Sequence, residues 1–183
     1  MGQKVHPIAF RLGFNQPWKS RWFRRNLRRG IIEDYRIREL LRELFPRAGI
    51  KEVVIERRED QIKVIIHTSK PGILIGRAGQ GTRDIAAKLN RGILEPTNKL
   101  ELEIREVKLP ELSAELIAQN VSQQIERRIA AKRAMRQAIA RAQEKGAKGV
   151  RIQVSGRIGG SEIARRDRMS VGSIPLSTIR TAI

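Results

Sequence analysis

The chain has 183 residues, of which 38 are Lys or Arg and 19 are Asp or Glu, so its formal net charge is +19. So large a charge on a short chain repels itself, and we expect a large anion as partner rather than a small-molecule substrate. Hydrophobic residues make up 40% of the chain, enough for a folded core, and the absence of cysteine excludes disulfide frameworks, zinc ribbons and thiol catalysis. No apolar run approaches the roughly 18 residues of a membrane span, so no membrane partner is expected.

Residues 1–30 contain eight basic residues and no acidic one. We interpret this stretch as a basic arm that becomes ordered on RNA. A mitochondrial transit peptide is the alternative, but the stretch shows no sustained amphipathic period. The candidate contact residues of the arm are Lys4, His6, Arg11, Lys19, Arg21, Arg24 and Arg25.

Residues 48–110 are nearly balanced in charge, and residues 31–108 show a regular succession of elements. An apolar stripe that includes Ile37 and Leu41 predicts a helix over 31–45, which Pro46 and Gly49 end. Alternating apolar residues then predict strands, and a four-residue spacing of Ile85 and Leu89 predicts a further helix. The expected order is α-β-β-α-α-β, with strands over 51–58, 61–68 and 99–108 and the last helix over 82–92.

A glycine-rich loop, Gly76-Arg77-Ala78-Gly79, lies between a short apolar helix and the helix over 82–92. Glycines allow the backbone to approach phosphates, and the N-terminus of the following helix adds positive potential. In this element order, the loop is typical of a KH domain, whose GXXG loop clamps single-stranded backbone. The alternative is a simple tight turn without a binding role. A nucleotide-binding phosphate loop is disfavoured, because no Lys precedes Thr82.

Pro110 follows Leu109 and opens the next helix, so we place a domain boundary there. One unbroken helix to residue 145 would bury unpaired cations among isoleucines, which is prohibitive, so we expect a break near 129–131. The basic residues around that break have one acidic neighbour, Glu126, and are either an ordinary solvated face or, as we favour, a surface that faces RNA. They are Arg127, Arg128, Lys132, Arg133 and Arg136.

The C-terminal stretch predicts a strand over 149–155, followed by turn-rich sequence. A second GXXG sequence begins at Gly156, but no apolar helix precedes it, so we interpret it as a hairpin turn. All seven aromatic residues lie within the first 45 positions, which excludes base stacking on aromatic rings beyond them. Any RNA contact there must use charge, backbone and aliphatic surface.

No catalytic constellation, metal-ligand spacing or cofactor motif stands out, so we expect no enzyme, no metal and no cofactor. Three hypotheses remain: a structural RNA-binding component of a larger assembly, a standalone KH-domain regulator or processing factor, and an RNA-dependent enzyme. The acid-free arm favours the first, because such arms need RNA to order them. The missing carboxylate clusters and phosphate-loop Lys disfavour the third.

Several blocks resemble those of the small-subunit ribosomal protein S-three family of bacterial type. They lie almost throughout the chain and form a specific set when taken together: Met1–Pro7, Phe10–Gly13, Pro71–Gly79, Glu126–Arg128, Lys132–Arg136, Gly146–Gly149 and Val154–Arg165.

The resemblance implies a type II KH domain followed by an α/β C-terminal domain of two helices and a small sheet, an α+β fold overall. It implies a place in the head of the small subunit, with ribosomal RNA and the neighbouring proteins S-ten and S-fourteen as partners. It also implies that the basic residues of 127–136 line the mRNA entrance, where incoming structure is opened. The ribosome would be cytoplasmic, with an organellar one as the alternative.

We therefore expect a basic arm at 1–30, a KH domain at 31–108 and a C-terminal domain at 109–183. The sequence departs from the family pattern in two places. Asp167-Arg168-Met169 stands where family members usually carry an aromatic residue. They also usually continue into a final aromatic-rich strand, whereas this chain stops at Ile183, so we expect a C-terminal sheet that lacks its last strand.

Overall fold

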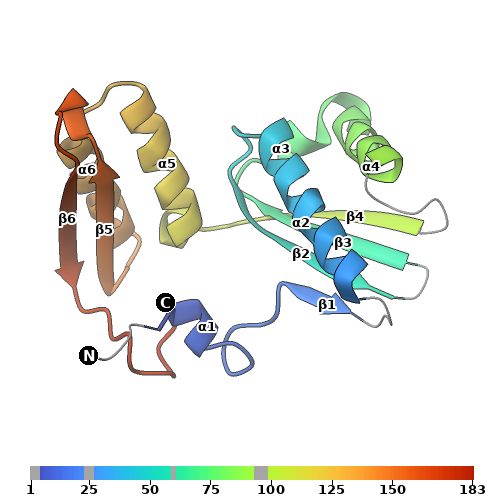
Figure 1. The fold of residues 1–183 in the computed structure, drawn as a ribbon, viewed down its shortest axis with the longest axis horizontal. Coiled ribbons are helices and arrows are strands. Elements are labelled where there is room, and N and C mark those ends of the chain that lie inside the picture. Colours follow the sequence, from blue (N-terminus) through green and yellow to red (C-terminus); the bar gives the residue numbers. More distant parts are fainter. Residues whose placement is uncertain (1–4, 23–26, 59–60, 93–98) are drawn as a thin grey trace. The chain divides into compact units, whose positions relative to one another are not determined.

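The computed structural model describes residues 5–22, 27–58, 61–92 and 99–183. The chain divides into two compact units, one made of Trp18–Lys108 and the other of Met1–Pro17 together with Leu109–Ile183 (Figure 1). One division therefore falls between Lys108 and Leu109. That each unit folds by itself stays a prediction.

The unit of Trp18–Lys108 is built on a four-stranded sheet. Its strands β1 (Ser20–Trp22), β2 (Ile50–Arg57), β3 (Gln61–Thr68) and β4 (Lys99–Glu106) lie in that order across the sheet. The central pair β2–β3 is antiparallel, whereas β1 runs parallel to β2 and β4 parallel to β3. A parallel neighbour requires a crossover connection, and helices supply it between β1 and β2 and between β3 and β4.

Three helices cover one face of this sheet: α2 (Leu27–Leu44), α3 (Pro71–Ile75) and α4 (Gln80–Gly92). Their apolar residues join the alternate β-branched residues of β2 and β3 in one core, in which Ile37, Leu41, Leu74 and Leu89 are fully buried. This α-β-β-α-α-β arrangement confirms the predicted KH fold. Helix α2 begins four residues earlier than expected, and β1 was not predicted, because three residues are too few to show an alternation.

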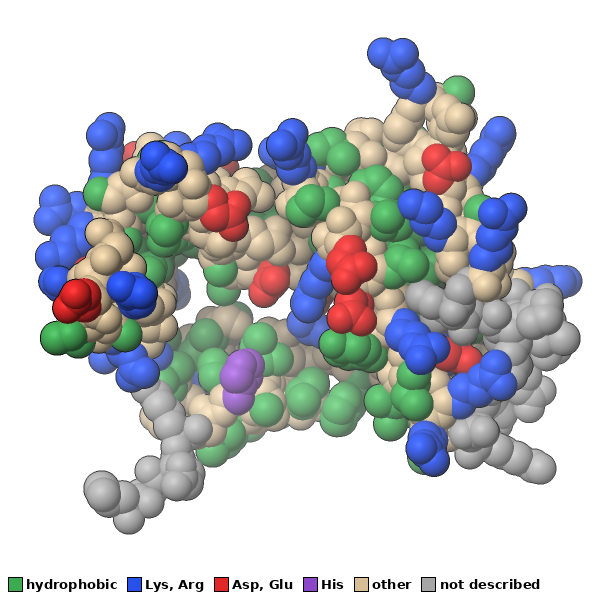
Figure 2. Space-filling model, turned by 45° about the horizontal axis from the view of Figure 1, so that its top comes forward, with side chains coloured by type: hydrophobic (Ala, Val, Ile, Leu, Met, Phe, Trp, Pro, Cys, Tyr) green, Lys and Arg blue, Asp and Glu red, His purple; other side chains and the backbone are tan. Residues whose placement is uncertain are grey.

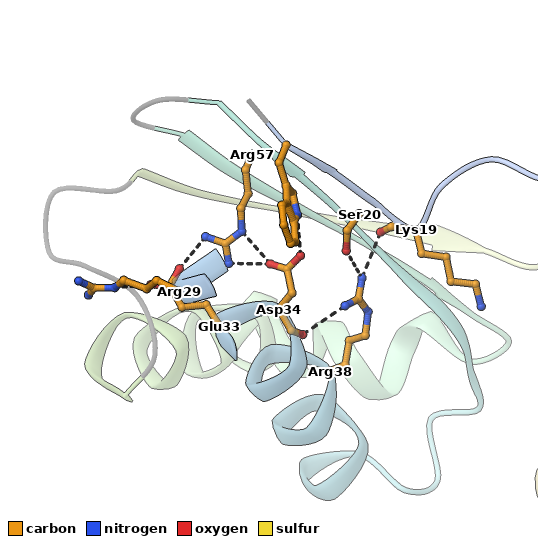
Figure 3. Close-up of polar contacts among 8 residues, drawn as sticks. Lys19, Ser20, Arg29, Glu33, Asp34, Arg38 and Arg57 are labelled. Carbon is orange, nitrogen blue, oxygen red and sulfur yellow. Dashed lines mark hydrogen bonds and ion pairs between the residues drawn. The ribbon is translucent and has the colours of Figure 1, made fainter. Parts of the chain in front are cut away.

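A buried ionic cluster fastens β1 and β2 to α2 (Figure 3). The Arg57 guanidinium donates to Asp34 Oδ1 at 2.7 Å and to Glu33 Oε2 at 2.7 Å, and all three side chains are at most 5% exposed. The indole N–H of Trp22 donates to the other Asp34 oxygen at 2.9 Å, and Arg29 donates to Glu33. Two carboxylates thus meet two guanidiniums, so the buried charges are compensated.

The second unit packs two helices against a β-hairpin. Helix α5 (Ala114–Glu126) follows the 3-10 turn η2 (Pro110–Leu112), and α6 (Ala131–Glu144) follows α5. Strand β5 (Gly149–Gly156) pairs antiparallel with β6 (Arg165–Gly172), and the 3-10 turn η3 (Ile158–Gly160) lies between them. The break between α5 and α6 occurs where the charge argument placed it. The second GXXG lies in the β5–β6 connection, as predicted.

Two expectations are wrong here. The sequence after residue 155, expected to be turn-rich, contains the strand β6 over Arg165–Gly172; its run of arginines hid the alternation of Asp167, Met169 and Val171 on the other side. The first 30 residues are not one separate arm either. Helix α1 (Pro7–Phe10) belongs to the C-terminal unit, whereas β1 and the start of α2 belong to the other. Residues 1–4 and 23–26 lie outside the described part.

Candidate nucleic-acid interface

The GXXG loop joins α3 to α4 through two glycines whose left-handed backbone conformation does not occur in a regular helix. Gly76 has φ 66° and Gly79 has φ 75°, backbone that favours glycine, and Ala78 between them has φ 51°. These turns separate α3 from α4 and leave Arg77 and Ala78 exposed at the tip. The Thr82 hydroxyl donates to the Gly79 carbonyl at 2.7 Å and fixes the exit of the loop. The loop therefore presents backbone and one guanidinium beside the first turn of α4, a suitable place for phosphate.

Helices α3 and α4 meet closely behind the loop. A Cβ atom on Gly81 would lie 2.3 Å from the Leu74 carbonyl oxygen, so only glycine permits this approach. Leu74 faces the core, while Ile73 and Ile75 on either side of it are 44% and 42% exposed. These two isoleucines were not predicted as site residues, because apolar side chains of a short helix are expected in the core. They offer aliphatic surface beside the loop, on which bases can rest where no aromatic residue is present.

A tight turn between α5 and α6 holds Arg127 and Arg128 at the surface. The Ile129 N–H donates to the Gln124 carbonyl at 3.0 Å, and the Arg128 N–H donates to the Ile125 carbonyl at 2.8 Å. This pair of hydrogen bonds is the Schellman C-cap, which requires a left-handed residue and usually uses glycine. Here the left-handed residue is Arg128, with φ 63°. The arginine at this position therefore strains the backbone, whereas glycine would not.

Helix α6 separates its apolar from its basic residues. Ala134, Met135, Ile139 and Ala142 are buried. The opposite side of α6 is exposed, and no described residue forms an ion pair or hydrogen bond with the side chain of any of the five predicted cations of the turn and the helix. They are Arg127, Arg128, Lys132, Arg133 and Arg136. The space-filling view shows many Lys and Arg side chains and few acidic ones over the part of the chain that contains α5, α6 and the β5–β6 hairpin (Figure 2).

The predicted contact residues of the arm are dispersed, and Arg11 is a correction. Its side chain is buried, and its guanidinium donates to the carbonyl oxygens of Thr178 at 2.6 Å, Thr181 at 2.7 Å and Pro7 at 2.9 Å, with longer bonds to Pro175 and Leu176. A guanidinium that is fully buried and donates from all three of its nitrogens is not available as an RNA contact. Arg11 instead holds the C-terminal residues against α1.

Of the other arm residues, Lys19 and Arg21 lie along β1 and are exposed, but acidic neighbours on β2 face them. Lys19 pairs with Glu52 at 3.9 Å, and Arg21 pairs with Glu56 at 3.8 Å. His6 is exposed beside α1. The remaining members, Lys4, Arg24 and Arg25, lie outside the described residues.

The open face of the four-stranded sheet is neutralised by similar pairs. Lys63 of β3 lies 3.0 Å from both Glu101 and Glu103 of β4, and Arg105 lies 2.6 Å from Glu103. Hydrogen bonds from Arg105 and then Lys63 lower the pKa of Glu103 to about 2, so it stays ionised at any ordinary pH. This face carries paired charge and offers phosphate little net attraction, unlike the α5–α6 surface.

None of the helices in the described ranges combines the length and apolarity that a membrane crossing requires. Within those ranges, no three His, Cys, Asp or Glu side chains gather as a metal site would need.

Comparison with known proteins agrees with both halves of the structure. A KH-domain family model matches residues 36–112, and the family model of the ribosomal protein S3 C-terminal domain matches residues 121–183. The whole chain is similar to the small ribosomal subunit protein uS3 of Caldicellulosiruptor bescii, at 47% identity over 82% of that protein. It is likewise similar to the uS3 proteins of Aquifex aeolicus, at 47% over 86%, and Persephonella marina, at 44% over 81%.

Relatives this similar over the full chain show the family to which it belongs. A KH fold with an exposed GXXG loop, followed by the ribosomal C-terminal domain, is the architecture of a structural RNA-binding protein of the small subunit rather than of an enzyme. The chain belongs to the small ribosomal subunit protein uS3 family.

Proposed function

We propose that this protein binds ribosomal RNA in the head of the small subunit and that its α5–α6 surface contacts incoming mRNA at the entrance and helps to open it. The observation that carries the proposal is the group of five exposed cations around the α5–α6 turn, which no described residue neutralises. Their mutual repulsion costs stability, and phosphates relieve it. Arg128 adds a second argument, because backbone strain tends to persist where a side chain has a function.

The GXXG loop is the second proposed RNA contact, made by Gly76, Arg77, Ala78 and Gly79. Its support is geometric: an exposed tip, left-handed glycines and the first turn of α4 at one place. Aliphatic side chains of Ile73 and Ile75 flank it and provide surface for bases. The proposal assigns phosphate to the loop and does not assign a base sequence.

Protein neighbours form the third part of the proposal. Leu27, Ile31 and Tyr35 lie four residues apart on α2 and are 57%, 56% and 64% exposed. An exposed apolar stripe of this kind usually marks a protein contact. It supports docking of neighbouring small-subunit proteins, for which the family resemblance suggests S-ten and S-fourteen. Because the relatives named above are bacterial, we infer a cytoplasmic rather than an organellar ribosome.

A charge reversal at the loop tests its RNA contact. In the full chain, Arg77→Asp with Ala78→Asp places two negative charges where a phosphate is expected. We predict at least a tenfold loss of affinity for unstructured single-stranded RNA, about 1.4 kcal/mol, measured by fluorescence anisotropy. The fold should persist, because the loop is exposed and Asp tolerates left-handed backbone.

The matched control is Arg42→Asp with Ala182→Asp, which changes the net charge equally at two other exposed positions. It should lose clearly less affinity than the loop variant. If both variants lose the same, only net charge matters. If the loop variant binds like the unmodified chain, the GXXG segment is a turn and the assignment is wrong.

A further inference from the structure

The β5–β6 hairpin has one face that packs and one that does not. Directly opposed residues of an antiparallel pair share a face, so the register sorts the side chains. Ile152 lies opposite Met169, and Val150 opposite Val171, on the face that packs against α6. The other face carries three opposed pairs, each made of one arginine and one uncharged polar residue: Arg151 with Ser170, Gln153 with Arg168, and Ser155 with Arg166.

The three arginines are exposed, and no described residue forms an ion pair or hydrogen bond with their guanidiniums. The acidic residue of the two strands, Asp167, lies on the opposite face, opposed to Val154. The KH sheet differs, because there Lys63 and Arg105 of the open face each have a carboxylate within reach. The open face of the hairpin is therefore basic without compensation.

The spacing of the arginines on this face suits a polymer with regularly repeated negative charges. Arg166 and Arg168 are two residues apart on β6, which places their Cα atoms about 7 Å apart. Arg151 is the diagonal neighbour of Arg168 across the pair, at a similar separation of roughly 7–8 Å. Three long side chains on one face of a two-stranded support can reach successive charges of a polyanion. The short Ser155 and Ser170 leave the surface open between them.

Two properties point to paired RNA as the occupant. The side chains of this face are arginines, serines and one glutamine, so it offers unpaired bases neither the aromatic nor the aliphatic surface on which single strands are usually held. A helical RNA instead presents rows of phosphates and is recognised mostly by shape and backbone. We propose that the open face of the β5–β6 hairpin, through Arg151, Arg166 and Arg168, is a separate surface that binds the phosphate backbone of double-helical RNA. The proposal deepens the proposed function, since it assumes that the chain is an RNA-binding protein.

Charge removal on the full chain tests the surface. Arg151→Gln, Arg166→Gln and Arg168→Gln together keep the strands polar but remove three charges. The control removes three charges from exposed arginines of the other unit, Arg42, Arg47 and Arg58, also to Gln. The probe is a fully paired RNA of about 16 base pairs without single-stranded ends. For the hairpin variant, the slope of log affinity against log salt concentration should flatten by roughly 2–3, because each phosphate that is no longer neutralised removes about 0.9 from the slope. The slope of the control should flatten clearly less.

Equal flattening in both variants would show that net charge alone is responsible and would overturn the proposal. Unchanged duplex binding by the hairpin variant would overturn it as well and would leave an acidic protein as the occupant of this face. The Arg77→Asp, Ala78→Asp loop variant should bind the duplex almost as the unmodified chain does. Failure of the loop assignment on single strands and failure of the hairpin assignment on duplex are therefore distinguishable.

The lack of cysteine permits a second, positional readout. Ser155→Cys and Ser170→Cys place a single thiol on the open face, and Glu43→Cys places one on exposed α2. Each thiol carries a tethered iron chelate that cleaves nearby RNA backbone. We expect the duplex to be cut from positions 155 and 170 and not from 43. Cleavage that is equal from all three positions would contradict the proposal.

Discussion

Arg128 shows how one residue joins stability to function. A left-handed conformation costs a residue with a side chain about 1–2 kcal/mol, and glycine avoids the cost. The Schellman cap at the end of α5 would form as well with glycine. Arginine at this position therefore lowers the stability of the fold. The attraction of a nearby phosphate can offset that loss.

Replacing Arg128 with Gly should therefore separate the two effects. We expect the free energy of unfolding in urea to stay the same or to rise by up to about 1 kcal/mol, because strain relief outweighs the added freedom of the unfolded chain. Affinity for single-stranded RNA should fall, and its salt slope should flatten by about 0.7.

Arg127→Gly is the matched control, because Arg127 has φ −78° and carries no such strain. It should weaken RNA binding to a similar degree but also lose about 0.5–1 kcal/mol of stability, the usual cost of Gly in regular backbone. A clear loss of stability in Arg128→Gly, equal to that in the control, would show that the strain argument is wrong.

Arg11 marks a limit of sequence reasoning at the same scale. Its place in a basic stretch predicted an RNA contact, yet its guanidinium is buried among carbonyls of residues 175–181. A count of charges shows where cations are along the chain but not where backbone carbonyls from more than 160 residues away converge. No local signal in the sequence distinguishes Arg11 from its exposed neighbours.

At the scale of elements, the contact of α3 with α4 determines the shape of the GXXG loop. Both helices come together over Gly81, whose α-hydrogen faces the Leu74 and Ile75 carbonyls. Any separation of the two helices would move Gly76 and Gly79 relative to the first turn of α4. The phosphate site of the proposal therefore depends on a residue outside the GXXG sequence.

Gly81→Ala tests that dependence. The added Cβ would lie 2.3 Å from a backbone oxygen, so the helices must move, at a cost of about 1–3 kcal/mol by analogy with overpacked cores. We expect a lower midpoint of unfolding in urea and weaker binding of single-stranded RNA. Gly72→Ala in α3 is the control, because a Cβ atom added there would meet nothing within 4 Å and alanine favours helix. If both variants behave alike, the α3–α4 contact does not position the loop.

Elements with a strong apolar pattern were predictable and weakly patterned ones were not. The alternation of Ile62, Val64 and Ile66 indicated β3, and the conflict between cations and isoleucines indicated the break before α6. Strand β1 was not predicted, because the hydrogen bond between Trp22 and Asp34 positions it and its sequence shows no alternation of apolar residues. Strand β6 was not predicted, because the arginines on its open face obscure the alternation of its other residues. The GXXG loop and the basic side of α6 could be located from the sequence, whereas the hairpin face required the β5–β6 register.

At the scale of the whole molecule, the net charge of +19 is not spread evenly. On the KH sheet Lys63 and Arg105 pair with carboxylates, and Arg57 is compensated inside the core. Exposed cations without a partner among the described residues lie at the α5–α6 turn, along α6 and on the open face of the hairpin, and also on the other unit, as at Arg42, Arg47 and Arg58. This distribution fits a protein that holds RNA with more than one surface, so that the loss of one surface need not prevent assembly.

The most direct test of the mRNA entrance assignment is translation through structured mRNA. Small subunits are assembled with the Lys132→Ala, Arg133→Ala, Arg136→Ala variant or with the control Arg42→Ala, Arg47→Ala, Arg58→Ala, and elongation is timed on two templates. We predict that ribosomes with the first variant assemble, read unstructured mRNA normally and pause longer at a stable hairpin, while control ribosomes match the unmodified ones. An equal slowing on both templates, or none on either, would contradict the assignment of the α5–α6 cations to the mRNA entrance.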